Sequence, residues 1–532
     1  MFAHWDACTP SERTSLLAQL RALDVARAVR IFSRAVADHR SGVSSSGAIE
    51  PVDVDGSVLT ATPATIERWR RVGLTAASKG ELAVVLLAGG QGTRLGSADP
   101  KGMVDLGLPS GRTLFRMQAE RLLKLGALAA EAAGGKNKNE NKPERAAGVK
   151  PASIPWYVMT SPHTHAPTVR YFEDNAYFGL DAADVTFFQQ GSLPCFDDDG
   201  KIIMKSRSEV ATAPDGNGGL YAALHAAGCL SDMKRRGVRH VYAYCVDNAL
   251  VQVGDPVYVG FCAARGADAG AKVIAKAYPT EPVGVFTRRD GNVHVVEYSE
   301  LPPELATATD PASGKLRLNA ANIVLHYYAL DFLERCCDPD GNVQASLVYH
   351  VAHKKVPHVS RDGQSTVAPD SPNGIKLEAF IFDVYAFARE VAFLEGERAA
   401  DFAPVKNKEG TGKDSPDTAR ALLSALHARW IKAAGGLVDG GSPGGLVEVT
   451  AAVSYAGENL APLVEGVTVP AGTVIDEAWA ARGGGEGRKG EGSAAADKTT
   501  RRTGGGRKRA AVEGAAREPT PPGEARVTRS RR

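Results

Sequence analysis

The stretch LLAGGQGTRLGSADPKGMVDLGLPSGRTLF, residues 86–115, decides the fold of this chain. It continues the short apolar run 82–87, and four glycines follow closely, so we predict a buried parallel strand that ends in a glycine-rich loop. Glycine permits a positive φ and lets backbone N–H groups approach a phosphate closely. Arg94 and Lys101 add positive charge to the same loop. The spacing matches neither a Walker A pattern nor a clean GxGxxG fingerprint, but it predicts a phosphate-binding loop.

Similar short apolar runs recur along the chain, at residues 156–159, 185–188, 241–246 and 273–275. Helical segments separate several of them, for example residues 114–125, whose apolar side chains share one face. Strands that alternate with helices indicate an α/β domain with a mainly parallel sheet. Ligands bind beyond the carboxyl ends of the strands in such sheets, so the loops after Leu87 and Val246 are the first candidates for a site.

The N-terminal and central parts of the chain differ in pattern. A capping box at residues 9–12 begins a helix, and we predict a helical segment over residues 1–75. Residues 76–435 form the predicted central α/β domain. Within it, residues 134–150 are polar and predict a surface insertion, and an Asp-Gly pair within residues 286–300 predicts a β-hairpin.

The C-terminal part changes character twice. Short β-favouring pieces broken by Gly and Pro predict a small β-rich domain over residues 436–481. Residues 482–532 hold 14 Lys and Arg against 6 Asp and Glu in a composition dominated by Gly, Ala, Arg and Pro, so we predict a disordered basic tail. The tail carries a net charge of +8 and the rest of the chain −6.

The overall composition excludes several classes of protein. The 532 residues are 43% hydrophobic and 23% charged, which excludes disorder throughout the chain. No apolar run approaches the roughly 18–20 residues that span a bilayer, and the first residues lack the layout of a signal peptide. The seven cysteines are scattered without a CxxC pair, which argues against a disulfide framework or a zinc site. We therefore expect a soluble, reduced, cytoplasmic protein that does not bind membranes.

The glycine loop belongs to a longer series of motifs. Its GGxGTRLG…PKG text resembles the nucleotidyltransferases that make UDP-sugars. Nine further motifs follow in order, namely FFQQG (187–191), APDGNGGLY (213–221), YCVDN (244–248), PTEPVGV (279–285), VVEYSE (295–300), NAANI (319–323), PNGIK (372–376), VKN (405–407) and SYAGE (454–458). Over roughly residues 5–480 the chain resembles the eukaryotic UDP-N-acetylglucosamine pyrophosphorylases.

This resemblance implies a fold and leaves three departures. The implied fold is a Rossmann-like nucleotidyltransferase domain with a mainly parallel mixed sheet, an N-terminal helical segment and a small C-terminal β-rich domain. The insertion at 134–150 is longer than the family needs, the region 440–445 looks shortened, and the tail has no counterpart. None of these departures touches a motif, so they bear on oligomerisation and localisation rather than on chemistry.

The implied reaction joins UTP and N-acetylglucosamine-1-phosphate into UDP-N-acetylglucosamine and pyrophosphate. The sugar phosphate attacks the α-phosphorus in line, and its second pKa of about 6 makes it mostly dianionic at pH 7, so no general base is needed. Catalysis then consists of positioning and charge neutralisation by backbone donors, Lys, Arg and a divalent ion, Mg²⁺ or Mn²⁺. The expected assembly is a monomer or a homodimer.

The resemblance also implies roles for individual residues. The catalytic cations are Arg94, Lys101 and Lys406. Asp247 is the implied metal ligand, because a single carboxylate can hold Mg²⁺ together with phosphates and water. The nucleotide contacts are Leu87, Ala88, Gly89, Gly90, Lys101, Gln190, Gly216, Asp247 and Lys376. The sugar contacts are Asn217, Glu297 and Asn322.

Alternatives remain open at this point. Asp247 could cap the end of a strand, and Lys376 and Lys406 could be ordinary solvated side chains. The substrate could be another sugar-1-phosphate, such as that of glucose or N-acetylgalactosamine. The chain could also be a non-catalytic sugar-nucleotide sensor, or it could bind nucleic acid through its tail. The tail has no aromatic residue between its basic ones, so only non-specific, salt-sensitive nucleic-acid contacts are expected there.

Overall fold

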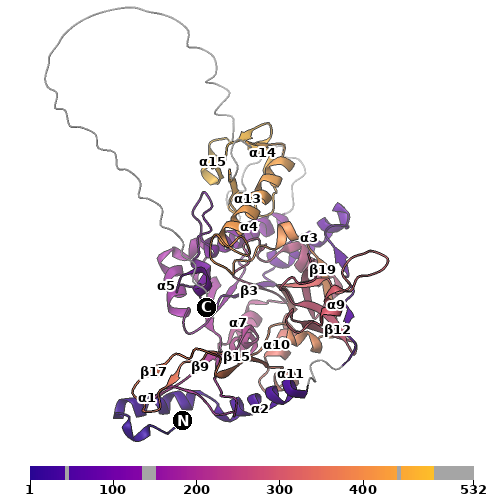
Figure 1. The fold of residues 1–532 in the computed structure, drawn as a ribbon. Coiled ribbons are helices and arrows are strands. Elements are labelled where there is room, and N and C mark those ends of the chain that lie inside the picture. The colour runs from indigo at the N-terminus through magenta and orange to yellow at the C-terminus, as the bar shows by residue number, and fades with distance from the viewer. Residues whose placement is uncertain (42–46, 135–150, 440–444, 484–532) are drawn as a thin grey trace, which may run out of the picture. The chain divides into compact units, whose positions relative to one another are not determined.

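The computed structural model describes residues 1–41, 47–134, 151–439 and 445–483 (Figure 1). The capping box at the start of the chain is confirmed, because Thr9 Oγ1 accepts from the Glu12 N–H and the Glu12 carboxylate accepts from the Thr9 N–H. Most of the predicted insertion 134–150, the shortened region 440–445 and the tail 482–532 lie outside the described residues. In the part of the chain that is described, no helix is both long and apolar enough to cross a membrane.

The central feature is an eleven-stranded sheet whose main path runs β2-β19-β11-β14-β10-β3-β4-β5. Every strand pair on this path is parallel except the two that involve β14, which is antiparallel to β10 and to β11. The strands on the path are β2 (Gly56–Ser57), β3 (Leu82–Leu87), β4 (Trp156–Thr160), β5 (Val185–Gln189), β10 (His240–Cys245), β11 (Ala269–Ala275), β14 (Ala320–Ala329) and β19 (Val391–Glu395). The predicted mainly parallel mixed sheet is therefore confirmed.

A hairpin and an N-terminal strand extend one side of this sheet. The hairpin consists of β12 (Val285–Arg289) and β13 (Asn292–Val296), and β1 (Glu50–Pro51) pairs with β12. Asp290 and Gly291 form its two-residue turn with φ values of 49° and 81°. Positive φ at both turn residues is what a tight hairpin of this twist requires, and the predicted hairpin is confirmed.

Helices cover both faces of the sheet. Alternate residues of β3 enter two different apolar cores, as expected for a strand that is buried on both sides. One core is closed by α3 (Pro63–Ser78), α4 (Leu114–Ala133), α5 (His165–Asp174) and α8 (Pro256–Arg265). The other is closed by α6 (Leu220–Ala226), α7 (Cys229–Arg236), α10 (Leu330–Cys337) and the 3₁₀ helix η8 (Asp383–Phe387).

The N-terminal helices pack on small sheets rather than on the central one. Phe32 of α2 stacks on Phe196 with ring centroids 4.5 Å apart. The two N-terminal helices are α1 (Pro10–Ala22) and α2 (Val25–Ser41). Two other short helices, α9 (Pro303–Thr307) and α11 (Asn342–Ser346), come later in the chain. The small sheets pair β6 (Ser192–Pro194) with β9 (Thr212–Pro214), β7 (Met204–Ser206) with β8 (Glu209–Val210), β15 (His350–Lys354) with β18 (Gly374–Glu378), and β16 (His358–Val359) with β17 (Thr366–Val367).

The C-terminal part has a small apolar core of its own, built around Ile431, Val464 and Ile475. Its strands pair in parallel, β20 (Leu437–Val438) with β22 (Thr468–Val469) and β21 (Glu448–Val449) with β23 (Val474–Ile475). Its helices are α13 (Pro416–Ala433), α14 (Ala461–Val464) and α15 (Glu477–Ala481), preceded by the short α12 (Arg398–Asp401). The predicted boundaries at 75/76, 435/436 and 481/482 stay predictions.

Candidate active site

The loop after β3 folds back on itself and places Lys101 beside the glycine pair. The Gly92 N–H donates to Asp99 O at 2.8 Å, and the Lys101 N–H donates to Gly90 O at 3.2 Å. At Gly96 the chain turns with φ 89°, a conformation that glycine adopts without strain. The aliphatic part of the Lys101 side chain therefore lies alongside Gly90, as expected for a loop that presents both backbone donors and an ammonium to a phosphate.

Three of the predicted nucleotide contacts lie against one another. A Cβ at Gly89 would stand 2.1 Å from Gln190 Oε1, so any larger residue there would have to displace the Gln190 amide. Gln190 Nε2 donates to Gly216 O at 3.3 Å, which joins two motifs that are distant in sequence. Gly216 has φ 88°, and a Cβ there would meet Ala379 O at 2.3 Å. These close approaches give the glycines of both motifs a steric reason.

A cation and a carboxylate meet where β3 and β10 end together. Leu87 and Cys245 are paired in register, and Lys101 Nζ lies 3.5 Å from Asp247 Oδ2. Burial raises the pKa of the Cys245 thiol to about 12; Asp247 adds to this rise, while Lys406 and Lys101 oppose it. All three charged side chains therefore lie within electrostatic reach of Cys245, and the structure brings Lys101, Lys406 and Asp247 together.

Backbone hydrogen bonds hold the Asp247 loop to the segment that carries Lys406. The Val405 N–H donates to Asp247 O at 2.8 Å. Asn248 Nδ2 donates to Asp401 O at 2.7 Å, and Asn248 Oδ1 accepts from the Ala403 N–H at 2.9 Å. Asn248 is buried, and its side chain reinforces the single antiparallel bridge between Asn248 and Pro404 that pairs the two loops.

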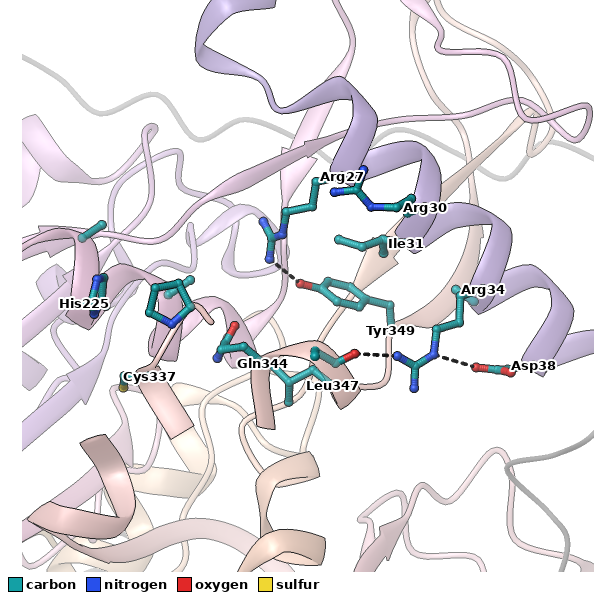
Figure 2. Close-up of a pocket in the computed structure, with 15 residues that line it drawn as sticks. Arg27, Arg30, Ile31, Arg34, Asp38, His225, Cys337, Gln344, Leu347 and Tyr349 are labelled. Carbon is teal, nitrogen blue, oxygen red and sulfur yellow. Dashed lines mark hydrogen bonds and ion pairs between the residues drawn. The ribbon is translucent and has the colours of Figure 1, made fainter. Parts of the chain in front are cut away.

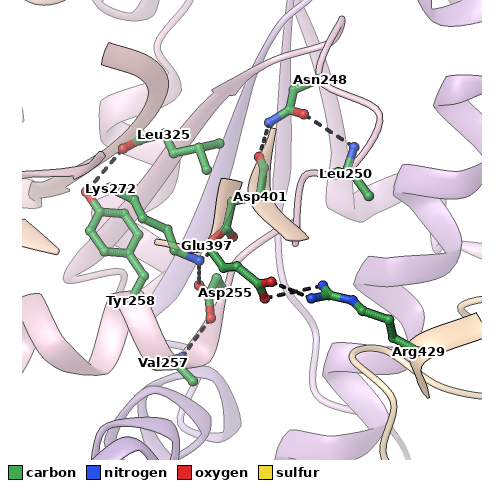
Figure 3. A network of polar contacts seen from close by, with 10 residues as sticks. All are labelled: Asn248, Leu250, Asp255, Val257, Tyr258, Lys272, Leu325, Glu397, Asp401 and Arg429. Carbon is green, nitrogen blue, oxygen red and sulfur yellow. Dashed lines mark hydrogen bonds and ion pairs between the residues drawn. The ribbon is translucent and has the colours of Figure 1, made fainter. Parts of the chain in front are cut away.

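Beneath these loops lies a buried ion cluster that the sequence did not reveal (Figure 3). Lys272 Nζ lies 3.0 Å from Asp255 Oδ2 and also pairs with the Asp401 carboxylate. Burial opposes the charge of Lys272, but Asp255 and Asp401 outweigh it and raise the pKa of its ammonium above the ordinary value. Because Asp401 O also accepts from Asn248, the cluster supports the position of the Asp247 loop.

Two of the three predicted sugar contacts, Asn322 and Glu297, lie around Gly284. The Asn322 N–H donates to Gly284 O at 2.9 Å, and a Cβ at Gly284 would stand 2.8 Å from Glu297 Oε1. Asn322 Oδ1 accepts from the Val324 N–H at 3.0 Å and lies 3.1 Å from His326 Nε2, while its Nδ2 has no hydrogen-bond partner among the described residues. Burial, assisted by Glu300, raises the pKa of Glu297, and Lys406 lowers it, so Lys406 lies near Glu297 as well as near Asp247.

Asn217 lies on the opposite turn, in the 3₁₀ helix η7 (Asn217–Gly219) directly after Gly216. Its Oδ1 accepts from the Ile381 N–H at 2.9 Å.

Two of the predicted site residues are not tied to this arrangement. Arg94 is exposed and makes no hydrogen bond or ion pair with the described residues. Burial raises the pKa of the Cys195 thiol and Lys376 on β18 opposes that rise, but no polar contact within the described ranges joins Lys376 to Lys101 or Asp247.

The candidate site can bind a magnesium ion through a single protein carboxylate. Outside the gaps at 42–46, 135–150, 440–444 and 484–532, no group of three or more His, Cys, Asp and Glu side chains could hold a metal. Asp247, with its side chain 20% exposed, offers a single hard oxygen ligand. Mg²⁺ commonly takes one or two carboxylates and completes its shell with phosphates and water, so Asp247 fits an ion that arrives with the nucleotide.

A cavity of about 690 Å³ lies away from this arrangement, between α2 and the segment of α10 and α11 (Figure 2). Two of its three arginines already have partners: Arg34 donates to the carbonyl of Ala345 at 2.7 Å, and Arg27 donates to Tyr349 Oη at 3.3 Å. None of the predicted site residues lines it. The cavity is therefore not the candidate active site.

Comparison with known proteins agrees with this geometry. The family model described as UTP–glucose-1-phosphate uridylyltransferase matches residues 32–438. UDP-N-acetylglucosamine diphosphorylase 2 of Arabidopsis thaliana is 44% identical over 474 residues, which cover 88% of this chain and 89% of that protein. UDP-N-acetylglucosamine pyrophosphorylase of Saccharomyces cerevisiae is 39% identical over 491 residues, which cover 90% and 97%.

A solved structure supports the same relationship. The uridine diphosphate N-acetylglucosamine pyrophosphorylase from Trypanosoma brucei, crystallised with an inhibitor, superposes with a TM-score of 0.72 at 31% identity. The match covers 85% of this chain and 89% of that one. The resemblance drawn from the motifs and the nucleotidyltransferase fold it implied are confirmed. The chain belongs to the UDP-N-acetylglucosamine pyrophosphorylases of the UTP–glucose-1-phosphate uridylyltransferase family.

Proposed function

We propose that this chain is a uridylyltransferase that forms UDP-N-acetylglucosamine and pyrophosphate from UTP and N-acetylglucosamine-1-phosphate. The observation that carries the proposal is the Lys101–Asp247 pair at the common end of β3 and β10. The pair lies beside the glycine loop, where Lys101 can neutralise a phosphate and Asp247 would hold the metal. Relatives more than 40% identical over most of the chain carry the name UDP-N-acetylglucosamine diphosphorylase.

The residues divide the work between the two substrates. The backbone of Leu87, Ala88, Gly89 and Gly90 meets the nucleotide, and Gln190 with Gly216 reads the uracil edge, which needs both a donor and an acceptor. Lys101, Lys406, Arg94 and Lys376 neutralise the phosphates. Asp247 would hold Mg²⁺ or Mn²⁺, which when bound reduces the charge repulsion between the two phosphate groups.

The sugar side rests on Asn217, Glu297 and Asn322. The Asn322 Nδ2, which is unpaired within the described residues, can donate to the acetyl carbonyl, and the Glu297 carboxylate can accept from a hydroxyl or from the acetamido N–H. Asn217 faces the same substrate from the turn that follows Gly216. The sugar phosphate is already a dianion at pH 7, so these residues orient it and no side chain needs to remove a proton.

Substrate preference tests the proposal directly. We expect kcat/KM for N-acetylglucosamine-1-phosphate to exceed that for glucose-1-phosphate by roughly a hundredfold, since the smaller sugar leaves two protein polar groups unpaired. The measurement is pyrophosphate release with UTP and Mg²⁺ across the 1-phosphates of N-acetylglucosamine, N-acetylgalactosamine and glucose. Equal use of glucose-1-phosphate would replace the proposal with a general UDP-sugar pyrophosphorylase, and the N-acetylgalactosamine arm measures the choice at C4.

A further inference from the structure

His350, at the start of β15, lies outside the set of residues that the motifs single out. Its Nε2 lies 3.3 Å from Asp383 Oδ2, and its Nδ1 lies 3.7 Å from Glu300 Oε1. The ring stacks on Phe380 with centroids 4.2 Å apart and planes inclined by 28°. A carboxylate at each ring nitrogen suits an imidazolium, which is a donor at both positions.

One carboxylate belongs to the turn that carries the predicted sugar contact Glu297, and the other belongs to a turn that is hydrogen-bonded to Asn217. On one side, the Glu300 N–H donates to Glu297 O at 2.9 Å, so Glu300 and Glu297 share a turn after β13. On the other side, Asp383 Oδ2 accepts from the Phe380 N–H at 2.9 Å, and the next residue, Ile381, donates to Asn217 Oδ1. His350 therefore links the turn of Glu297 to the turn that fixes Asn217.

The local charge also needs this cation. Glu300 and Asp383 both raise the pKa of Glu297, while His350 and Lys406 lower it, so the three carboxylates repel one another across the site. Burial opposes a charge on His350, but Asp383 and Glu300 outweigh it and raise its pKa to about 9. Further charged or titratable groups near the cluster are Glu378 opposite on β18, His294 on β13, Arg289 on β12 and His39 on α2.

We propose that His350 is a positioning residue for the sugar phosphate, whose imidazolium ties the Glu297 turn to the Asn217 turn and offsets the carboxylate charge beside them. The inference rests on the proposed function, because it takes Glu297 and Asn217 as sugar contacts. His350 touches neither substrate. Without its charge, an incoming dianion would face three carboxylates that only Lys406, Arg289 and His39 still offset from a distance.

Steady-state kinetics of His350→Gln separate this role from a general one. We expect KM for N-acetylglucosamine-1-phosphate to rise by about tenfold, the usual scale for losing a hydrogen bond to a charged group, with KM for UTP changed by less than about twofold. The matched control is His353→Gln, the same substitution on the same strand, where His353 is 55% exposed and lies 3.6 Å from the exposed Asp198. His350→Lys restores a cation and should recover most of the lost affinity.

The pH dependence gives a second readout. The folded pKa of His350 is raised above its ordinary value of 6.5, so its contribution to stability is complete below about pH 6.5, and the charged contact in the folded protein is lost as pH rises through about 9. Wild-type KM for the sugar phosphate should stay flat to about pH 8 and then rise. In His350→Gln it should be high throughout, without that rise. Among the 12 histidines, the imidazole NMR signal missing from His350→Gln should titrate near pH 9 in the wild type.

Three results would overturn the inference: an imidazole that titrates below pH 7, an equal rise in KM for UTP, or a His350→Lys variant no better than His350→Gln. Failure of the proposed function looks different. A wild-type protein that does not use N-acetylglucosamine-1-phosphate refutes that function, whereas the imidazole titration requires no turnover and judges the charged contact separately.

Discussion

Asp247→Asn is expected to lower kcat for UDP-N-acetylglucosamine formation by at least about a hundredfold, a scale typical of removing one preorganised electrostatic group. The substitution keeps the size of the side chain and removes the charge that faces Lys101 Nζ at 3.5 Å. It leaves the backbone carbonyl that accepts from Val405 in place, so the thermal unfolding midpoint should change little. The measurement is pyrophosphate release at saturating substrates over a series of Mg²⁺ concentrations.

The matched control for this experiment is Asp99→Asn in the same loop. The Asp99 carboxylate is exposed and accepts from Ser97 Oγ at 2.8 Å, so the control removes one negative charge without touching the Lys101 pair. Activity of Asp99→Asn should stay near that of the wild type. If Asp247→Asn turned over as fast as the control in saturating Mg²⁺, Asp247 would be a strand-end cap and not a metal ligand.

Lys272→Met should lower the free energy of unfolding by about 3–5 kcal/mol, since it removes the cation between two buried carboxylates. Asp255 and Asp401 would then lie side by side in the interior with no partner of opposite charge. The measurement is urea-induced unfolding at pH 7. Lys205→Met is the control, because Lys205 pairs with Glu209 on the surface at 2.7 Å and its loss should cost less than about 0.5 kcal/mol.

The sign of the pH dependence makes the Lys272 result specific. Burial raises the pKa of Asp401, and without Lys272 only the hydrogen bond from the Glu397 N–H still opposes that rise. A carboxyl whose pKa is raised in the folded state binds protons more readily than in the unfolded state, so the variant should regain stability as pH falls from 7 towards 5. A Lys272→Met protein as stable as the wild type at pH 7, with no such gain, would mean that water or movement of the chain already solvates the two carboxylates.

The parts of the site that could be predicted are those with a local signal. The glycine loop could be predicted because its strand, glycines and basic residues are consecutive in the sequence. The four predicted apolar runs form β4, β5, β10 and β11. Gln190, Gly216 and Asp247 were placed by motifs rather than by composition, and the structure adds the steric reason through the close approach of Gly89 to Gln190. A local sequence motif was therefore sufficient to single out each of these residues.

Lys272 and His350 could not be found in this way. Lys272 directly precedes the apolar run 273–275, but it meets a carboxylate 129 residues away, and no local pattern points to that partner. His350 lies on β15, Glu300 on the turn after β13, and Asp383 at the start of η8. These three segments become neighbours only once the small sheets have formed. A lysine in an apolar run can signal such a cluster, but its partners follow from the topology alone.

The pairing of β3 has a consequence for the order in which the protein is made. On one side β3 pairs with β4, Val84 opposite Trp156, but on the other side Leu82 pairs with His240, which the ribosome adds 158 residues later. During that interval the nascent chain contains β3, a strand that is buried in the finished fold, with one of its edges unpaired. An unpaired strand edge of this kind can pair with other chains. Synthesis that stalls before residue 240, or a truncation there, leaves the phosphate loop attached to an unfinished sheet, so this interval is where chaperone binding would matter most.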